Sequence, residues 1–148
     1  MRLRSYRPSD LEILHQIDRA CFPAAVAYSR TELASYIDHP KSQTWVAEED
    51  GQISGFLVAD RQSRWMAHVI TLDVIAEWRR RGVGTLLMDA AQAWAIRAGL
   101  NLMYLETSEK NISAHQFYMQ RGYDTYREIP RYYGNGVAAW VMVKYLRK

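Results

Sequence analysis

One stretch of the sequence, residues 69–99, holds a strand pattern, a glycine-rich turn and a helix pattern in immediate succession. The strand pattern is Val69-Ile70-Thr71-Leu72-Asp73-Val74-Ile75, and the turn is Arg79-Arg80-Arg81-Gly82-Val83-Gly84-Thr85. Apolar residues then recur at helical spacing until Gly99, which suits a helix stop: Val83, Leu86, Leu87, Ala90, Ala91 and Trp94. A second strand pattern, residues 101–107, follows. A helical crossover of this kind predicts that the two strands are parallel in an α/β fold.

The glycine-rich turn has the composition of an anion site. Gly82 and Gly84 leave backbone N–H groups unobstructed at the start of a helix, where the helix dipole also favours negative charge. An ATPase phosphate loop would need a lysine after the second glycine, and Thr85 stands there. A dinucleotide fingerprint would need a third glycine where Leu87 stands. A diphosphate of another kind fits the turn, although an ordinary solvated turn fits it equally well.

The rest of the chain predicts an ordered alternation of elements. Capping-box pairs Ser9/Glu12 and Ser29/Glu32 begin two helices after a strand at residues 2–6. A hairpin follows, with strands at 44–48 and 53–60 joined through Asp50-Gly51, and then a strand at 66–75. Asn111 caps a later helix, and residues 123–128 and 137–146 form a closing hairpin. The predicted order is β-α-α-β-β-β-α-β-α-β-β.

Length and composition narrow the class of protein. The 148 residues, 49% hydrophobic, predict a single domain over residues 1–148. No apolar run approaches the roughly 20 residues that span a bilayer, and the N-terminal sequence lacks a signal-peptide pattern, so we expect a cytoplasmic protein with no membrane partner. Cys21 is expected to be a buried structural thiol, and no Cys/His spacing suggests a metal. The net charge of +3 suits acidic ligands, but the arginine run lacks the interleaved aromatics of a nucleic-acid site.

Two local patterns in this order resemble the GNAT superfamily of acetyl-coenzyme-A-dependent N-acetyltransferases. Arg79-x-x-Gly82-x-Gly84 matches its Gln/Arg-x-x-Gly-x-Gly/Ala diphosphate loop. The segment from Asn111 to Tyr123 matches its Asn-x-x-Ala-x-x-x-Tyr-x-x-x-Gly-Phe/Tyr pattern. The resemblance covers nearly the whole chain. It implies a GNAT fold: a mixed sheet of about seven strands, splayed at the coenzyme site, with about four helices.

Within the superfamily, the chain is most similar to N-terminal acetyltransferases, in particular those that acetylate an alanine of a ribosomal protein. Leu105-Glu106 before Asn111, Phe22-Pro23 and Arg131-Tyr132-Tyr133 carry this closer match. The chain departs from the group at Val137-Ala138-Ala139, where a Glu-Asp-Ala run is common, at Ser108 in place of an arginine, and at Ala76 in place of a proline. These departures weaken the acceptor assignment and leave the coenzyme assignment unchanged.

The resemblance assigns roles to individual residues. It implies acetyl-CoA as co-substrate and no metal. Tyr118 would donate a hydrogen bond to the leaving thiolate, and Glu106 would be the base, acting directly or through water. The expected coenzyme-binding residues are Leu72, Asp73, Val74, Arg79, Arg80, Arg81, Gly82, Val83, Gly84, Thr85 and Asn111, with Leu72 to Val74 contributing backbone groups alone. Asn111 would bind coenzyme, cap its helix, or do both. Candidates for flanking the acceptor are Phe22, Tyr28, Tyr132 and Tyr133.

The ordinary pKa values of the reacting groups also bear on these roles, independently of the family resemblance. An α-amino group has a pKa of about 7.7–8.0 and lysine about 10.4, so an N-terminal acceptor needs less help in losing its proton. Tyrosine, at about 10, is a weaker acid than a thiol at about 8.5, so Tyr118 is better described as a hydrogen-bond donor than as a full proton donor. Considered apart from the motif, Glu106 is compatible with a surface carboxylate and Tyr118 with a core aromatic. The acceptor tyrosines are equally compatible with plain packing roles. The four histidines, at 15, 39, 68 and 115, are assigned structural or surface roles.

Three functions remain open at this point. The first is acetyl transfer, by direct attack in a ternary complex, to the N-terminal α-amine of a protein. The second is acetylation of a small-molecule amine, and the third is a non-catalytic acyl-CoA-binding module. The sequence leaves open a monomer or a homodimer, and an acyl group slightly longer than acetyl.

Overall fold

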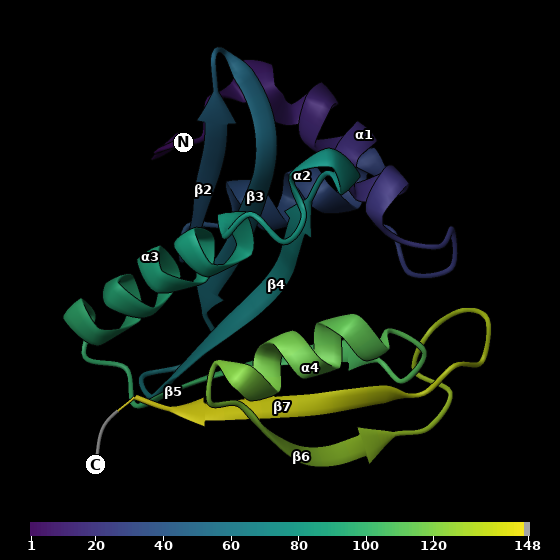
Figure 1. The fold of residues 1–148 in the computed structure, drawn as a ribbon. Helices are drawn as coiled ribbons and strands as arrows, with labels where there is room; N and C mark the ends of the chain where they lie inside the picture. The colour runs from purple at the N-terminus through teal and green to yellow at the C-terminus, as the bar shows by residue number, and fades with distance from the viewer. Residues whose placement is uncertain (147–148) are drawn as a thin grey trace.

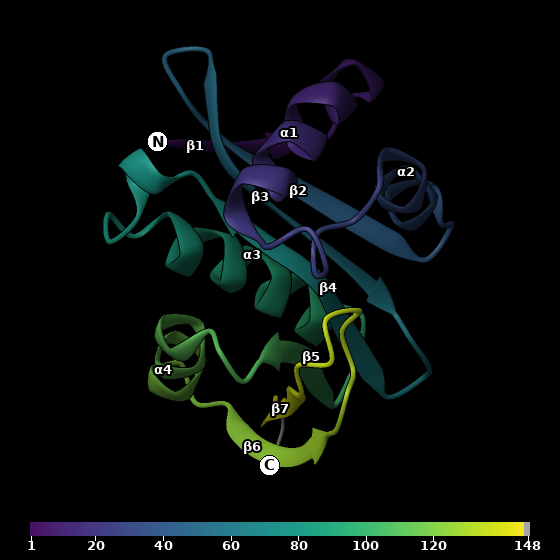
Figure 2. The ribbon, with the colours of Figure 1, turned by 90° about the vertical axis from the view of Figure 1, so that its right-hand side faces the viewer.

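The computed structural model describes residues 1–146, which form one seven-stranded mixed sheet with helices on both faces (Figures 1 and 2). Its strand order is β1-β2-β3-β4-β5-β7-β6, and every neighbouring pair is antiparallel except β4 with β5. The elements are β1 Arg2–Ser5, η1 Pro8–Asp10, α1 Leu11–Cys21, α2 Arg30–Asp38, β2 Ser42–Glu49, β3 Gln52–Arg61, β4 Met66–Val74, η2 Ala76–Trp78, α3 Val83–Arg97, β5 Leu102–Ser108, α4 Ile112–Gln120, β6 Asp124–Ile129 and β7 Ala139–Tyr145. The predicted order of elements and the fold class are confirmed.

The two faces of the sheet carry different pairs of helices. Helices α1 and α2 cover one face, where their apolar residues pack on Val46, Phe56 and Val58. Helix α3 lies on the other face with α4 beside it, and its residues pack on Leu57 and Met103. Because the hydrophobic clusters lie on opposite sides of one sheet, most side chains of the central strands are buried on both faces.

Strands β4 and β5 separate soon after they begin. Their parallel pairing runs only from Met66–Leu102 to His68–Tyr104, although both strands continue beyond those residues. Beyond that point β4 stays with β3 while β5 stays with β7, so the sheet divides into two halves (Figure 1). The predicted splay is therefore present, and it exposes one edge of β4 between the halves.

Local sequence signals explain most element boundaries. Asp50 and Gly51 both have positive φ, at 51° and 79°, as a tight hairpin turn requires. Ser29 and Glu32 form the predicted capping box of α2. Asn111 caps α4, since its side-chain oxygen accepts the N–H of Ala114 at 3.2 Å.

Two details of the helices differ from prediction. Asp10, not the Ser9/Glu12 pair, closes the start of the first helical segment, because its carboxylate accepts the Arg7 N–H at 2.8 Å. In α3, Leu86 is exposed, and the buried face consists of Val83, Leu87, Met88, Ala91 and Ala95. The helix packs on β2, β3, β4 and β5, and its buried face is the one turned toward these strands.

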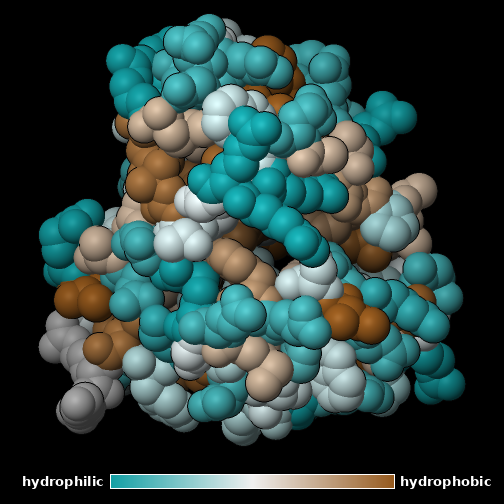
Figure 3. Space-filling model, viewed as in Figure 1, coloured by the Kyte–Doolittle hydropathy of each residue, from teal (hydrophilic) through white to brown (hydrophobic). Residues whose placement is uncertain are grey.

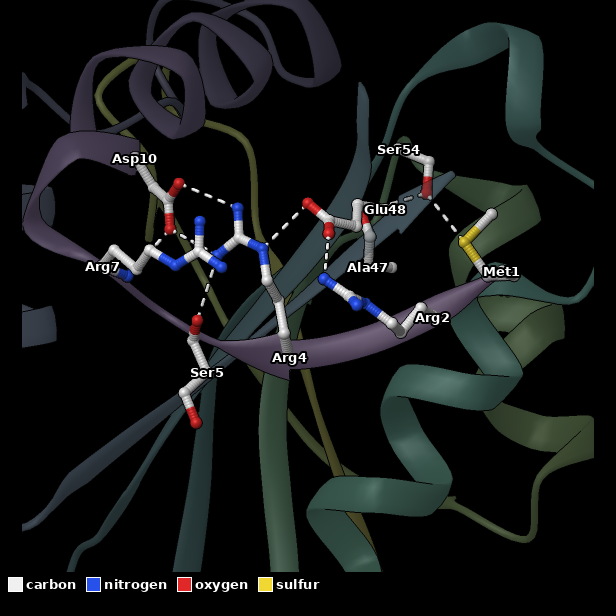
Figure 4. A network of polar contacts seen from close by, with 9 residues as sticks. All are labelled: Met1, Arg2, Arg4, Ser5, Arg7, Asp10, Ala47, Glu48 and Ser54. Carbon is white, nitrogen blue, oxygen red and sulfur yellow. Dashed lines mark hydrogen bonds and ion pairs between the residues drawn. The ribbon is translucent and has the colours of Figure 1, made fainter. Parts of the chain in front are cut away.

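An ion-pair network joins β1 to β2 and to the first helical turn (Figure 4). The Arg4 guanidinium donates to both oxygens of Asp10, at 2.8 and 3.0 Å, and its Nε donates to Glu48 at 2.9 Å. Arg2 donates to the other oxygen of Glu48 at 2.7 Å. Arg4 and Asp10 are largely buried, so each charge needs the other, and the network fixes the N-terminal strand to the sheet edge.

Candidate active site

The glycine-rich turn lies beside the open edge of β4 (Figure 1). Gly82, with φ of 83°, precedes the first residue of α3, and Arg80 also has positive φ, at 62°. Val83 is buried at the helix start, while Thr85 is exposed in the first turn. The turn thus presents the positive end of a 15-residue helix at the split between the two half-sheets.

Gly84 is required by a close approach between α3 and α4. A Cβ at this position would lie 3.3 Å from the Phe117 ring and 3.9 Å from Leu72. Figure 3 shows the side of the molecule that carries α3 and α4. Hydrophilic side chains lie over its centre, and the surface is hollowed between them and α4. The glycine therefore brings the helix start close to both the edge of β4 and α4.

The open edge of β4 presents main-chain groups. The N–H of Ile75 donates to Ser54 in β3, and antiparallel pairs alternate in type, so the N–H groups of Val74 and Leu72 face away from β3. They face the gap where β5 has diverged. The N–H groups of residues 72 and 74 therefore point to where an extended ligand could pair with them, whereas the Val74 carbonyl already accepts side-chain contacts.

The three arginines of the turn lie in different environments. Arg79 is exposed, and its Nε donates to the Val74 carbonyl at 3.1 Å. Arg81 stacks over the Trp78 ring, with its Cζ 5.0 Å from the ring centre. Arg80 is exposed at the turn. Arg79 is therefore exposed to solvent, although its side chain is tied to β4.

The Val74 carbonyl accepts a second contact from Cys21. The thiol sulfur lies 3.4 Å from this oxygen, and burial raises the pKa of Cys21 to about 11. A thiol with so high a pKa is protonated at neutral pH and is a poor nucleophile. The predicted structural role of Cys21 agrees with this environment.

Tyr118 lies in α4 beneath the split. Its ring is buried and makes edge contacts with Phe117 and Tyr123, at centroid distances of 5.3 and 5.7 Å. Burial raises the pKa of Tyr118 above its ordinary range, with smaller contributions from Tyr123 and Asp73. The phenol is therefore a protonated hydrogen-bond donor, within electrostatic reach of β4.

Glu106 forms a close pair with His68. The distance from Glu106 Oε1 to His68 Nε2 is 2.6 Å, and the His68 ring stacks on Tyr104 with 4.5 Å between centroids. Burial, followed by the charge of Glu106, raises the pKa of Tyr104 to about 12. The pair lies where β4 and β5 cease to pair, on the face that carries α1 and α2.

Two loops bring tyrosines toward Glu106. Tyr28 belongs to the α1–α2 connection, and Tyr132 and Tyr133 belong to the β6–β7 connection. Burial raises the pKa of all three, and the charge of Glu106 adds to the effect at each. The loops also approach one another, since a Cβ at Gly134 would lie 3.8 Å from the Ala25 carbonyl. Figure 2 shows both loops on the same side of the sheet.

The structure therefore brings the predicted residues into two groups. The side chain of Asn111 caps α4, and Phe22 is half buried at the start of the α1–α2 connection. The group on the α3/α4 side contains the glycine turn, the β4 edge and Tyr118. The group on the α1/α2 side contains Glu106, Tyr28, Tyr132 and Tyr133.

Two side chains had no predicted part in the site. His68 was assigned a structural or surface role, and it contacts Glu106. Asp73 was expected to offer its backbone alone, and its carboxyl is buried. For His68, the signal in the sequence was weak, because only the parallel register, with His68 opposite Tyr104, reveals that it lies near Glu106. For Asp73, a charged residue inside an apolar strand was the available signal.

Comparison with known families decides the identity of this arrangement. The acetyltransferase (GNAT) family matches residues 11–123, which include the whole split, the glycine turn and Tyr118. The chain belongs to the GNAT family. It is accordingly an acetyl-CoA-dependent N-acetyltransferase, and the GNAT resemblance of the sequence is confirmed.

Individual relatives cover the GNAT domain almost completely. An uncharacterized N-acetyltransferase of Methanocaldococcus jannaschii is 29% identical over 146 residues, which span 97% of this chain and 91% of the relative. An N-alpha-acetyltransferase of Sulfurisphaera tokodaii is 26% identical, with 95% and 90% coverage. The ribosomal-protein-S18-alanine N-acetyltransferase of Escherichia coli has the same fold, with a TM-score of 0.87, 19% identity and coverage of 99% and 94%.

Two kinds of feature are absent from residues 1–146 of this GNAT protein. No helix in that range has the length and hydropathy to cross a membrane. No group of three or more His, Cys, Asp or Glu side chains within it is arranged to hold a metal ion.

Proposed function

We propose that this GNAT enzyme transfers the acetyl group of acetyl-CoA to the N-terminal α-amine of a protein, with an alanine N-terminus as the first candidate. The observation that supports the proposal best is the Glu106–His68 pair, which faces tyrosines from two loops at the split of the sheet. The N-alpha-acetyltransferase relative supports the same class of acceptor. The proposal treats residues 1–148 as one catalytic domain that acts in the cytoplasm as a monomer or a homodimer.

The donor would occupy the α3/α4 side. Its diphosphate would meet the N–H groups of residues 82–85 at the start of α3, with Arg80 and Arg81 close enough to pair with phosphate charge. Arg81 would leave its stack on Trp78 to do so. The pantetheine arm would pair with the open edge of β4 at Leu72 and Val74, as an added strand. Asn111 would keep its capping role beside it.

The acceptor would approach from the α1/α2 side, between the two loops. Phe22, Tyr28, Tyr132 and Tyr133 would flank the peptide, and Glu106 with His68 would take up the proton that the amine loses. An α-amine suits this pair, because with a pKa of about 7.7–8.0 it is partly deprotonated before it binds. The two sides meet at the split, so amine and thioester can come together there.

The acetyl group would then pass from sulfur to nitrogen in a single displacement step. The amine nitrogen attacks the thioester carbon, the C–N bond forms and the C–S bond breaks, and the sulfur leaves as a thiolate. The N–H of Val74 would stabilise the oxyanion, and the Tyr118 hydroxyl would donate a hydrogen bond to the thiolate. The amine proton passes to the His68–Glu106 pair, directly or through water.

A small-molecule amine is the second candidate acceptor. The departure at Val137-Ala138-Ala139 favours it, since an acidic run is common there in the N-terminal acetyltransferases. Ala138 and Ala139 are buried in the structure. They therefore act through packing at the start of β7, and their effect on the acceptor would be indirect. The peptide acceptor remains the stronger proposal.

The experiment is an acceptor screen at fixed acetyl-CoA, with release of CoA as the readout. Peptides that begin with Ala or Met are compared with the same peptides blocked by N-acetylation, and with polyamines, aminoglycosides and free amino acids. We expect turnover with free N-terminal peptides that disappears on blocking, even where an internal lysine is present. Faster turnover with a small amine than with every peptide would overturn the N-terminal assignment. CoA binding without turnover on any acceptor would favour the non-catalytic module.

A further inference from the structure

Two carboxyl groups lie together in the interior, between α1 and β4. Asp18 and Asp73 are 0% and 1% exposed. The Thr71 hydroxyl lies 2.5 Å from Asp73 Oδ1 and 3.5 Å from Asp18 Oδ1. The three side chains form one solvent-excluded cluster directly behind the open edge of β4. The mechanism proposed above uses none of them.

This cluster has too few hydrogen-bond donors for two ionised carboxylates. Thr71 has one hydroxyl proton, and its short contact is with Asp73 Oδ1. Asp18 Oδ2 accepts the backbone N–H of Tyr28 at 2.8 Å. Asp73 Oδ2 is buried and has no hydrogen-bond partner within residues 1–146. A bare carboxylate oxygen there would be costly, whereas a protonated one can donate to the neighbouring carboxylate.

The surrounding groups supply little compensating charge. Burial, followed by Asp18, raises the pKa of Asp73 well above its ordinary value, and the charge of Arg79 lowers it only in part. The other titratable groups that face Asp73 are Cys21 from α1 and Tyr118 from α4, and burial raises the pKa of both. Both are neutral at neutral pH, so neither offsets a second negative charge.

The cluster also anchors the connection between α1 and α2. Tyr28 in that connection is held at two points: its N–H binds Asp18, and its hydroxyl lies 3.4 Å from the Ile70 carbonyl. Ile70 lies at the irregularity where the pairing of β3 with β4 shifts register. The carboxyl cluster therefore links the position of Tyr28 to the strand that carries the split.

We propose that Asp73 carries a proton that it shares with Asp18, and that this shared proton holds Tyr28 and the α1–α2 connection against β4. Its effect on acceptor binding rests on the proposed function, in which Tyr28 flanks the acceptor. Without the proton, two negative charges repel inside one solvent-excluded cluster, and the connection loses its anchor. Asp73 is thus a positioning residue for the acceptor, and donor binding on the opposite face does not depend on it.

The proton can be tested without any acceptor. Asp73→Asn keeps a donor toward Asp18 and an acceptor for Thr71, but it has no proton to lose. We expect an infrared band of a protonated carboxylic acid at neutral pH in the wild type, and its loss in Asp73→Asn. An unfolded aspartate ionises near pH 3.9, so above that pH the wild type should lose up to tenfold per pH unit in its folding equilibrium relative to Asp73→Asn.

The positioning role is tested by kinetics with the full-length protein. Asp73→Ala removes the donor toward Asp18 and leaves that buried carboxylate with the Tyr28 N–H and the more distant Thr71 hydroxyl, so we expect a higher KM for an N-terminal peptide with unchanged acetyl-CoA binding. Asp73→Asn should restore the wild-type KM. If Asp73→Ala does not fold, Asp18→Ala takes its place, because it removes the acceptor of the Tyr28 N–H and should raise the KM for the peptide, whereas Asp18→Asn, which keeps an oxygen there, should not. An unchanged KM in Asp18→Ala would overturn the positioning role.

The outcomes separate this inference from the function proposed above. Absence of the infrared band, together with no relative loss of stability with pH, would overturn the shared proton whatever the acceptor is. If the wild type shows the infrared band but Asp73→Ala has an unchanged KM for the peptide, the positioning role would be overturned. No turnover with any peptide, combined with an intact band and stability slope, would count against the N-terminal acceptor and leave the shared proton standing.

Discussion

His68 Nε2 lies 2.6 Å from Glu106 Oε1, and His68 is the last residue of β4 that pairs with β5. A histidine and a carboxylate at this distance act as one unit, because the hydrogen bond between them fixes the orientation of both side chains. We expect His68→Ala and Glu106→Gln each to lower kcat by about 10²-fold or more. The kcat of the double variant should be only slightly lower than that of the slower single variant, because losses of kcat within one unit are not additive.

The measurement is a double-mutant cycle on steady-state rates, with acetyl-CoA binding measured in parallel. His39→Ala is the matched control, since His39 is exposed at the end of α2 and should leave kcat unchanged. Additive losses would indicate that His68 and Glu106 act independently.

Tyr118→Phe removes one hydroxyl and leaves the buried ring in place. We expect kcat to fall by about 10²-fold with the affinity for acetyl-CoA unchanged, because the hydroxyl is needed only when the thiolate leaves. Burial raises the pKa of Tyr118, so the wild type should show no loss of rate from phenol ionisation below about pH 10. Tyr145→Phe, at an exposed residue, is the control. An unchanged kcat would leave Tyr118 with a packing role alone.

Gly55→Ala should destabilise the fold, because a Cβ at this position would lie 2.5 Å from the Asp73 carbonyl oxygen. Two paired strands must shift to relieve this contact, so we expect a loss of about 1–3 kcal/mol in the free energy of unfolding. Gly134→Ala is the matched change, since its nearest neighbour would be 3.8 Å away, and it should stay within about 0.5 kcal/mol. The measurement is urea unfolding of both variants. Equal free energies of unfolding for Gly55→Ala and Gly134→Ala would contradict the prediction.

Asp10→Asn should weaken the network that anchors β1. The hydrogen bonds from Arg4 hold the pKa of Asp10 below its ordinary value, so the carboxylate stabilises the fold above its unfolded pKa of about 3.9. That contribution is lost as the pH falls through the lowered folded pKa. We expect a loss of about 1.5–3 kcal/mol at neutral pH and a smaller difference from the wild type in acid.

The control for Asp10 is Glu12→Gln, because Glu12 forms an exposed pair with Arg30. Exposed pairs contribute at most about 1 kcal/mol, so this variant should resemble the wild type at every pH. A difference between Asp10→Asn and the wild type that does not shrink in acid would exclude the charge as its cause.

Local patterns were sufficient to predict the order of the elements and the glycine-rich start of α3. The Asp50-Gly51 turn, the Asn111 cap and the glycine-rich helix start depend on residues close together in the sequence, so their geometry is encoded locally. Leu86 was misplaced because the rotation of α3 depends on which strands it meets. The roles of Glu106, Tyr118 and the loop tyrosines stay predictions, with the geometry compatible with them.

The contacts that the sequence did not predict are long-range. His68 and Glu106 are 38 residues apart, and Asp18 and Thr71 are 53 apart, so no local spacing reveals either pair. For Asp73 the apolar strand around it was a local signal of burial. Only the packing of α1 on β4 shows that its carboxyl lies in one cluster with Asp18 and Thr71.

The short pairing of β4 with β5 also makes the molecule mechanically uneven. The N-terminal strand belongs to one half-sheet and β7 to the other, so a force applied between residues 1 and 145 must cross a seam of three residue pairs. In a pulling experiment this seam, with the helices packed over it, should open before the hairpins do. Acetyl-CoA bound along the open edge of β4 would then stabilise the contact between the two half-sheets. The force needed to separate them should therefore rise when it binds.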